Sequence, residues 1–543
     1  MLLLVVGISD SGLAFQNTWQ FRKYNYWVNS GSFVYNITGV SLTGAEARHW
    51  VKYASSVWTT RTGAWVTAPM ASTIALECYD HGSASYNHDG YNVVSAIPGC
   101  RGGGTTNCSE AGFTKRWTSG WFGTGYLVEA DVCISNSQPG TGGPDNWQVS
   151  GFGDDLVGVL IHEMGHALGM EHPQDFNPPG PSETVMDFFN STSIRYRGRV
   201  PFGWDHDQLR SMYGSITHSR HWRRWDGTSW TVAHSMPGSG SDWQQPGATI
   251  AKKNGSNYQY VVAAAVDRYG DRIYFNSSPT PLTSSSTWSS GYITADTYRS
   301  PALAWNLQSG SSAIAVAAWP RRLHQEGNTC ILETYASNDL FVSGTKKSFW
   351  NGQYCTLLQP ALSYDRKSGR FVLAYLHHDP NNGSYHNEVL AMTSINGTSW
   401  TAPQPLGIKS TTAPGLACNY GDCLLTIGRL DQTQPWHQAW KLNVTSSGSV
   451  IQGTATQVQT PVQYRPDAGL YYKSGSGWRW LTTHQYSSTT HLPSIGVGDL
   501  YLHEDNTLPP AMDSWSVVDD SYFPGTWASH PFSFDAYLIY NSY

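Results

Sequence analysis

The sequence predicts a multidomain protein in which an α+β domain is followed by an all-β domain. Its 543 residues are enough for two or three domains. An apolar run with helical period lies near residue 160, in a region that also holds strand-like segments. From about residue 218 onward, short apolar runs alternate with Gly, Ser, Asn and Asp clusters, as in antiparallel strands and turns. We therefore expect domains at 16–215 and 216–543, after a leader at 1–15.

The segment from Leu156 to Leu168 predicts a helix. Its apolar residues recur three or four positions apart, as one buried helix face requires. Asp154 and Asp155 come just before it, where negative charge is favourable because a helix N-terminus carries partial positive charge.

The spacing H-E-x-x-H-x-x-G-x-x-H, at residues 162–172, predicts a metal site on this helix. His162 and His166 lie four positions apart, so both imidazoles can face one ion. Gly169 tolerates the left-handed conformation that ends a helix, and the reversed chain then brings His172 to the same ion. Three histidines leave the fourth position of a tetrahedral zinc ion open, which is typical of catalytic sites.

Glu163 is the predicted catalytic residue, because it lies beside His162 and can reach a water on the ion. Zinc lowers the pKa of such a water to about 7. Glu163 would take up its proton, the hydroxide would attack a peptide carbonyl, and the proton would pass to the leaving amine. The alternative is a chance run of histidines on a surface helix, against which the fixed spacing argues.

The motif resembles that of the metzincin metallopeptidases at every fixed position. The resemblance implies a methionine turn beneath the metal, and Met186 in the segment Ser182–Asp187 matches it. It covers about two hundred residues. Segments 89–94 and 126–132 are similar to sheet strands of a matrixin-type catalytic domain, and residues 202–214 are similar to its closing helix.

Some positions leave the subfamily open. Phe188 stands where astacins and serralysins carry a tyrosine that reaches the metal, so we expect no tyrosine ligand. Pro173 follows the third histidine, as in serralysins and unlike vertebrate matrixins. Matrixins are usually held latent by a pro-segment cysteine, and because no cysteine precedes Cys78, latency by that route is not expected. The resemblance also suggests structural Ca²⁺, with Asp131 either a candidate ligand or a solvated strand-end carboxylate.

Composition favours a secreted protein. Charged residues make up only 13% of the chain and the net charge is −6, with no basic run that would indicate a nucleic-acid partner. No apolar stretch is long enough to predict a membrane span. Residues 1–15 combine an apolar run with small residues up to Ala14 and resemble a secretory signal, and a buried first strand is the alternative.

The eight cysteines divide evenly between the two halves of the chain, which favours disulfides over free buried thiols. Cys100–Cys108 and Cys418–Cys423 would close short loops. Cys78–Cys133 and Cys330–Cys355 would complete the set, although four cysteines in each half allow three connectivities.

A repeat of about 55 residues runs through the second domain. Each unit begins with a proline followed by small and apolar residues, usually after a tryptophan; the prolines are Pro246, Pro301, Pro360, Pro414, Pro466 and Pro531. Several strands per unit at this period predict a β-propeller, and six units predict six blades. The segment His221–Met236 is expected to close the last blade. A string of small β-sandwich modules is the alternative.

Some units resemble those of sialidase-type propellers. The segment Ser394–Trp400 resembles a degenerate Asp-box with Asn396 in place of aspartate, and Asp226–Trp230 is a shorter version of it. This box is a structural hairpin, so the resemblance concerns the fold alone. We identify no sialidase arginine triad or nucleophile.

The function expected first is that of a secreted zinc endopeptidase acting on a protein or glycoprotein, with a propeller that binds substrate, a glycan or a cell surface. The alternative is an extracellular binding or adhesin protein whose Trp and Tyr rings stack on sugars, although packing inside the blades also explains such rings. A glycosidase would need paired carboxylates or a tyrosine nucleophile at the propeller centre, which the sequence does not place. The sequence gives no oligomeric state.

Overall fold

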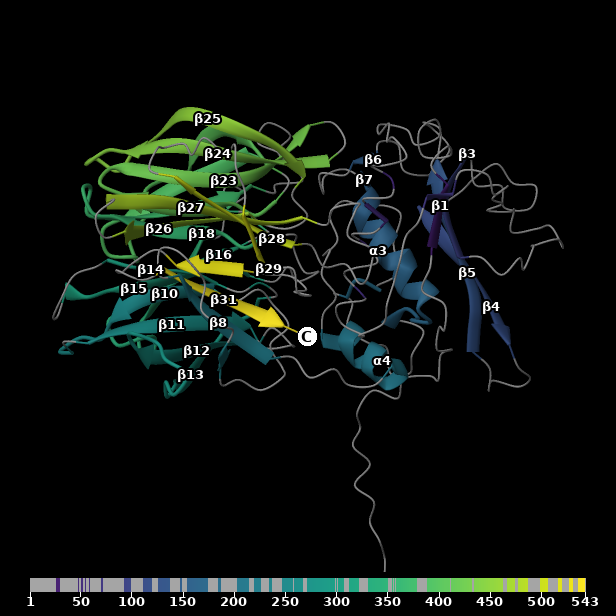
Figure 1. Cartoon of the computed structure of the whole chain (residues 1–543), viewed down its shortest axis with the longest axis horizontal. Helices are drawn as coiled ribbons and strands as arrows, with labels where there is room; N and C mark the ends of the chain where they lie inside the picture. The colour runs from purple at the N-terminus through teal and green to yellow at the C-terminus, as the bar shows by residue number, and fades with distance from the viewer. Residues whose placement is uncertain are drawn as a thin grey trace, which may run out of the picture.

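The computed structural model divides the chain into two groups of elements, which Figure 1 shows next to each other. Strands β1 to β7 and helices α3 and α4 make up the first group, and strands β8 to β31 make up the second. The structure describes residues 26–29, 47, 50–51, 54, 58, 70–71, 92–98, 111–119, 126–136, 147–148, 154–173, 184–186, 203–213, 219–225, 234–236, 247–256, 258–266, 271–297, 299, 301–306, 312–321, 331–349, 354, 356, 358–377, 388–410, 412–431, 434–461, 466–473, 477–486, 499–505, 516–519, 527–530 and 536–542.

A mixed sheet forms one layer of the first group. Its strands are β1 (Tyr26–Asn29), β2 (Met70–Ala71), β3 (Asn92–Pro98), β4 (Gly112–Ser119) and β5 (Tyr126–Asn136). They follow the order β2-β1-β3-β5-β4, and β4 at the end of this order is antiparallel to β5 while the other pairs are parallel. The described part of the strand-like segment 89–94 belongs to β3, and the segment 126–132 belongs to β5; both strands extend further along the chain.

Two side chains join β3 to β5 where their pairing begins. Asn92 Oδ1 accepts a hydrogen bond from the Ala130 amide, and Asp131 Oδ1 accepts one from the Val93 amide, both at 3.0 Å. The candidate calcium ligand Asp131 therefore serves the sheet itself, and its role in binding calcium stays a prediction.

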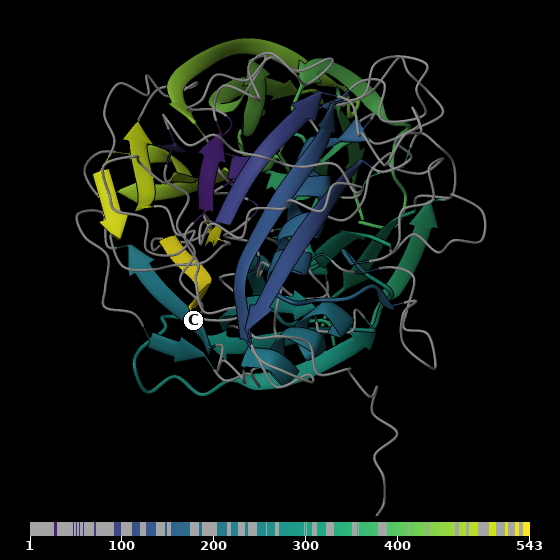
Figure 2. The same ribbon diagram turned by 90° about the vertical axis from the view of Figure 1, so that its right-hand side faces the viewer.

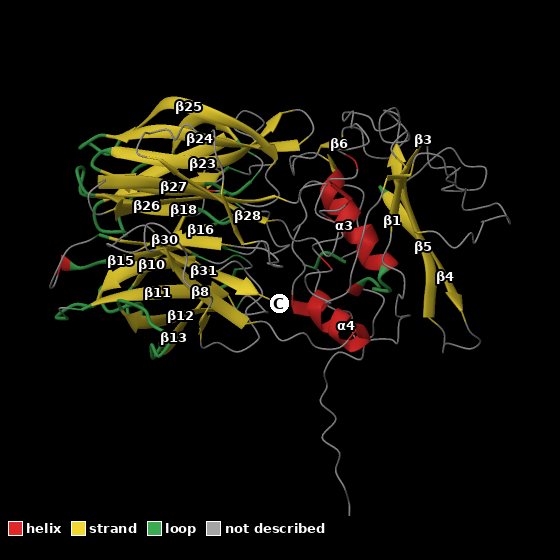
Figure 3. Cartoon of the chain, viewed as in Figure 1, coloured by secondary structure: helices red, strands yellow, loops and turns green. Residues whose placement is uncertain are grey.

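Helix α3 lies along one face of this sheet, as Figure 3 shows. Helix α3 (Leu156–Ala167) contacts β4 and β5. An earlier helical segment supplies buried residues at helical spacing, namely Ala47, Trp50, Val51, Ala54 and Trp58. Trp58 fixes the two helical segments together, because its Nε1 donates a hydrogen bond of 2.6 Å to the Ile161 carbonyl. Helix α4 (Gly203–Tyr213) adds Trp204, Leu209 and Met212 to the same core.

The second group consists of six four-stranded sheets. The first three are β10 (Gly247–Lys252), β11 (Gln259–Val266), β12 (Arg272–Pro279) and β13 (Ser289–Thr294); β14 (Ala302–Trp305), β15 (Ala315–Pro320), β16 (Leu332–Ser337) and β17 (Thr345–Phe349); and β18 (Ala361–Asp365), β19 (Arg370–Leu376), β20 (Glu388–Ser394) and β21 (Gln404–Lys409).

The last three sheets follow the same antiparallel plan. They are β22 (Gly415–Asn419), β23 (Asp422–Asp431), β24 (Gln434–Val444) and β25 (Val450–Pro461); β26 (Asp467–Lys473), β27 (Gly477–Tyr486), β28 (Asp499–Asp505) and β29 (Ser516–Asp519); and β30 (Trp527–His530), β31 (Ala536–Ser542), β8 (Ser219–Trp225) and β9 (His234–Met236).

The six sheets close into a β-propeller. Their first strands contact one another in the sequence β10, β14, β18, β22, β26, β30, and β30 contacts β10 again. Figure 2 shows this ring behind the strands of the mixed sheet. The closing blade combines β30 and β31 with β8 and β9 from the start of the domain. The expected closure of the last blade by the segment His221–Met236 is confirmed. The alternative prediction of a string of separate β-sandwich modules is wrong, because the six sheets form one closed ring.

Small residues let the inner strands approach closely. A Cβ placed on Gly247 would run into the carbonyl of Pro301, the residue before the next inner strand. A Cβ on Gly415 would come within 2.7 Å of the Pro466 carbonyl in the same way. The proline-plus-small pattern of the repeat therefore marks the point where each blade touches its neighbour.

The Asp-box-like segment forms the turn between β20 and β21. Asn396 Oδ1 accepts hydrogen bonds from the amides of Thr398 and Ser399, at 3.0 and 2.9 Å. Trp400 donates its Nε1 hydrogen to the Gly397 carbonyl at 2.9 Å. The segment is a structural hairpin, as expected, and Trp400 packs beside the blade core.

One predicted disulfide is present among the described residues. Cys418 and Cys423 are joined across the β22–β23 hairpin, and Cys133 is also disulfide-bonded. The partner of Cys133, the other predicted pairs and the leader at 1–15 lie outside the described residues. Within the described part of the chain, no helix is both long and apolar enough to cross a lipid bilayer.

Candidate metal centre

Helix α3 carries the first part of the histidine motif. It begins at Leu156, directly after Asp154 and Asp155, which form the short strand β7 (Asp154–Asp155) paired with β6 (Trp147–Gln148). The carboxylates thus precede the helix N-terminus as the sequence predicted. His162 and Glu163 on this helix are 2% and 4% exposed, so the chain buries two ionisable groups in its core.

A tight turn ends the helix and returns the chain toward it. Gly169 has a φ of 97°, a conformation that favours glycine. The Gly169 amide donates to the His166 carbonyl at 2.9 Å, and the Met170 amide donates to the Gly165 carbonyl at 3.0 Å. This pair of bonds is the Schellman arrangement of helix C-termini. Gly169 therefore ends the helix and turns the chain, as its position in the motif predicted, and His172 follows three residues later.

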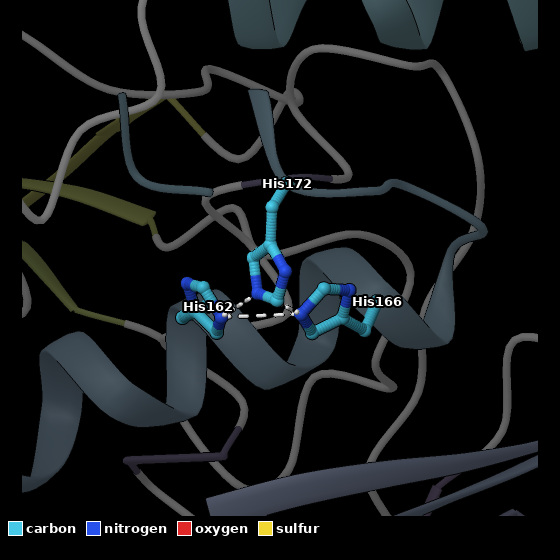
Figure 4. Close-up of side chains that lie close together, drawn as sticks. All are labelled: His162, His166 and His172. Carbon is cyan, nitrogen blue, oxygen red and sulfur yellow. Dashed lines mark hydrogen bonds between the residues drawn. The ribbon is translucent and has the colours of Figure 1, made fainter. Parts of the chain in front are cut away.

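The three histidines meet at one point, which Figure 4 shows in close-up. The distances between their Nε2 atoms are 3.1 Å from His162 to His166, 3.0 Å from His166 to His172, and 3.2 Å from His172 to His162. Among the described residues, these three side chains are the group of possible ligands that could hold a metal ion.

Hydrogen bonds on the opposite nitrogens show which ring atoms point inward as acceptors. His162 Nδ1 lies 2.8 Å from the Val185 carbonyl, and His166 Nδ1 lies 2.8 Å from the Met170 carbonyl. A carbonyl only accepts, so each Nδ1 carries the hydrogen and each Nε2 presents a lone pair. Converging lone pairs repel each other, and a cation between them removes that repulsion. The donor set therefore fits a metal ion.

The spacing of the donors also fits a small tetrahedral ion. Zinc binds imidazole nitrogen at about 2.0–2.1 Å, which places two nitrogens of a tetrahedron about 3.3 Å apart. The Nε2 separations in this site lie just below that value. Imidazole ligands suit zinc, copper, iron and nickel, so the geometry is that of a transition-metal site in general.

Burial keeps His166 in the form that binds a metal. It lowers the pKa of His166 from 6.5 to about 3, and the nearby His172 and Arg116 lower it as well, while the hydrogen bond to Met170 opposes the shift. The ring is therefore neutral at neutral pH. A neutral imidazole is the ligating form, so this histidine needs to lose no proton when a metal binds.

The predicted methionine lies against α3. Met186 is fully buried, and a Cβ on Gly165 would collide with its Sδ. The preceding Val185 accepts the His162 Nδ1 hydrogen through its carbonyl and donates its amide to Asp205 Oδ2 at 3.1 Å. Helix α4 is thereby linked to a histidine of the site through one residue.

Strand β4 supplies two contacts that sequence reasoning missed. Thr114 Oγ1 lies 2.7 Å from Glu163 Oε2 and 2.9 Å from the Glu163 carbonyl. Arg116 Nη2 forms an ion pair of 2.8 Å with Glu171 Oε1, directly before His172. Both contacts depend on how the sheet packs on the helix, and no local pattern near residue 114 indicates them. Asp205 was missed for the same reason.

The structure brings all the predicted ligands together and leaves one predicted detail, Phe188, undescribed. His162, His166 and His172 converge, and Glu163 lies beside them on α3. Pro173 is buried directly after the third histidine. Phe188, which replaces a possible tyrosine ligand, lies outside the described residues.

Comparison with known proteins gives a short match to a metalloprotease. No protein-family model matches the chain. Karilysin from Tannerella forsythia is 33% identical over 79 residues, which cover 12% of this chain and 17% of that protein. The chain thus spans about a sixth of the length of this curated relative.

Solved structures with some likeness to the chain are sialidases and their relatives. The NanB sialidase from Streptococcus pneumoniae aligns with a TM-score of 0.30 and 10% identity, over 54% of this chain and 45% of that one. A subtype N11 neuraminidase-like protein from the virus A/flat-faced bat/Peru/033/2010 aligns with a TM-score of 0.27 and 9% identity, over 48% and 87%. The propeller assignment rests on the pairing of its own strands.

Proposed function

We propose that this protein is a zinc-dependent endopeptidase. The observation that carries the proposal is the convergence of three Nε2 atoms within 3.2 Å of one another, at a helix where Glu163 directly follows His162. His162, His166 and His172 would hold the ion. The match to the metalloprotease Karilysin and the buried Met186 beneath the helix support the same proposal.

In the proposed hydrolysis, each residue of the site has its own role. A zinc ion held by the three histidines would supply a Lewis acid and would lower the pKa of a bound water to about 7. Glu163 accepts the proton of the attacking water and later delivers it to the nitrogen of the leaving amine. Val185 and Met170 hold the rings of His162 and His166 through their Nδ1 hydrogens, which keeps each Nε2 directed at the ion.

The disulfides favour an extracellular enzyme, and we propose a protein or glycoprotein as its substrate. The disulfide Cys418–Cys423 and the disulfide-bonded Cys133 suit an oxidising compartment. The propeller would present the substrate or attach the enzyme to a surface. Structural Ca²⁺ is part of the proposal as a second ion.

A single charge-removing substitution tests the proposal. Glu163→Gln keeps the size of the side chain and removes its ability to take a proton, so we expect casein hydrolysis to fall at least about a hundredfold. The bound zinc, counted by atomic emission, stays near one ion per chain. Chelation by 1,10-phenanthroline abolishes the wild-type activity, and added zinc restores it.

The matched control is Asp271→Asn, which removes one exposed carboxylate from the propeller and should leave hydrolysis unchanged. Full activity in Glu163→Gln, or in protein stripped of metal, would show that another mechanism operates.

A second candidate function is binding through the propeller, and one surface favours it. Tyr292 on β13 is 56% exposed, lies 5.8 Å from the ring of Tyr274, and has the Arg272 guanidinium 4.8 Å above its ring. An exposed ring of this kind can stack on a sugar. Glycan-array binding by the full chain, and its loss in Tyr292→Ala, would support this function. Equal binding by both proteins would remove this surface from consideration.

A further inference from the structure

Thr114 on strand β4 forms a side-chain hydrogen bond with the Glu163 carboxylate. Its Oγ1 lies 2.7 Å from Glu163 Oε2. The backbone carbonyl of Glu163 is a second possible acceptor, 2.9 Å from the same Oγ1. The hydroxyl has a single hydrogen, so it can donate to the carboxylate or to the carbonyl. The shorter distance is to the carboxylate, where the charge makes the stronger bond.

The placement of Thr114 follows from the alternation of strand β4. Alternate residues of a strand point to the same face, so Gly112, Thr114 and Arg116 all face helix α3. A Cβ on Gly112 would lie 3.1 Å from Glu163 Cγ, which shows that the glycine leaves room for the stem of the glutamate. Arg116 pairs with Glu171 two positions further along. One face of β4 therefore accommodates the glutamate stem, bonds its carboxylate and holds the segment of the third histidine.

The hydroxyl of Thr114 limits the rotation of the Glu163 carboxylate. The last side-chain torsion of glutamate is broad, so an unrestrained carboxylate rotates over a wide range. A charge-assisted hydrogen bond of 2.7 Å fixes one of the two oxygens and hence the plane of the group. Thr114 itself is short, with a β-branched side chain that is stiff about χ1.

We propose that Thr114 is a positioning residue, which holds the Glu163 carboxylate in the orientation from which it takes up and returns the proton. This inference rests on the proposed endopeptidase function. Thr114 acts through Glu163, whose carboxylate and carbonyl oxygens are the two possible acceptors of its hydroxyl hydrogen.

The test compares three substitutions at Thr114 in the full-length, zinc-loaded protein. Thr114→Val keeps the shape and removes the hydroxyl, so kcat falls between about tenfold and a hundredfold while KM changes less than about twofold. Thr114→Ser restores the hydroxyl and brings kcat back to within about threefold of the wild type. Thr114→Ala serves in place of valine if the valine variant does not fold. The matched control is Thr118→Val on the exposed end of the same strand, which leaves kcat unchanged.

Two further measurements separate orientation from general damage. Zinc affinity, measured by competition with a chelator, stays within about twofold in Thr114→Val, because the histidines are untouched. Crystal structures of the metal-free proteins place the Glu163 carboxylate in the wild-type orientation in Thr114→Ser and in a rotated one in Thr114→Val. In a Glu163→Asp background, whose shorter side chain does not reach the hydroxyl, Thr114→Val causes no additional loss of kcat.

Each result bears on one claim. Wild-type kcat in Thr114→Val, or equal losses in the valine and serine variants, overturns the role of Thr114 while Glu163→Gln still abolishes activity. A loss of zinc in Thr114→Val also overturns it, because the threonine would then support the metal instead of the carboxylate. Activity that survives in Glu163→Gln instead refutes the proposed function on which the inference rests.

Discussion

At the scale of single residues, the site combines groups whose roles are visible in the sequence with groups that only packing reveals. The spacing of His162, His166 and His172 fixes their convergence, because a helix and one glycine turn are local structures. Thr114 and Asp205 reach the same site from a strand and a helix far away in the chain. Nothing local marks these two residues, since a threonine in a strand and an aspartate in a helix are ordinary.

The glycine between the two helix histidines gives a prediction at this scale. Gly165→Ala would drive a Cβ into Met186 Sδ and to within 2.9 Å of Trp58 Cζ2, with little space to relax in a fully buried core. We expect a loss of about 1–3 kcal/mol in the free energy of unfolding and weaker zinc binding. Chemical denaturation and chelator competition measure the two effects.

The control for this overpacking is Gly291→Ala. A Cβ at Gly291 meets nothing within 4 Å, so the same chemical change should leave both quantities unaltered. Equal stability of Gly165→Ala and the wild type would mean that Met186 and Trp58 move apart more easily than their burial indicates.

At the scale of elements, the turn between β16 and β17 shows how side-chain hydrogen bonds offset backbone strain. Leu340 and Phe341 have φ values of 65° and 68°, which is costly for residues with a Cβ. Phe341 is buried and stacks on Phe275 of the preceding blade, with ring centroids 4.3 Å apart. Asp339 accepts hydrogen bonds from the Ser343 amide at 2.9 Å and the Ser337 hydroxyl at 2.7 Å.

This turn should make part of the propeller stability depend on pH. Burial alone would raise the pKa of Asp339, but the hydrogen bonds from Ser343 and Ser337 outweigh it and hold the pKa below 3.8. A carboxyl whose pKa is lower in the folded state stabilises that state above its unfolded pKa, and the contribution disappears as pH falls through the folded pKa. Asp339→Asn should therefore cost about 0.5–1 kcal/mol at pH 7 and much less near pH 2.

Calorimetry of the propeller transition at the two pH values measures this difference. A cost that is the same at pH 7 and at pH 2 would show that the charge of Asp339 contributes nothing. The exposed Asp271→Asn variant controls for the general effect of removing one negative charge.

At the scale of the whole molecule, periodicity predicted the architecture better than it predicted the contacts between parts. The recurring Pro-plus-small unit indicates six blades because each unit begins at an inner strand, where Gly247 and Gly415 show why a small residue is needed. The closing blade was also predicted, because the segment His221–Met236 precedes the first repeat unit and was expected to pair with the last one. No repeating sequence pattern predicts the pairing of β4 with β5, which positions Thr114. Which strand lies at the edge of the mixed sheet, and in which direction it runs, depends on packing throughout the core.

Ring closure gives the prediction that belongs to this scale. Deleting residues 527–543 removes β30 and β31, which leaves β8 without the partner it has along its whole length. We expect the propeller to lose its cooperative thermal transition and to be cleaved rapidly by added trypsin. Supplying residues 527–543 as a separate peptide should restore protection. A truncated protein that melts as sharply as the full chain would mean that five blades hold the ring without the sixth.

The pairing of β8 with β31 also sets the order of events during synthesis. These strands lie about 310 residues apart, so at roughly 5–20 residues per second β8 leaves the ribosome about 15–60 s before its partner exists. The histidine helix and its sheet are complete well before then. A nascent chain therefore carries the complete three-histidine segment while the edge of Ser219–Trp225 that pairs with β31 is still open. We expect chaperone protection to matter most during this interval.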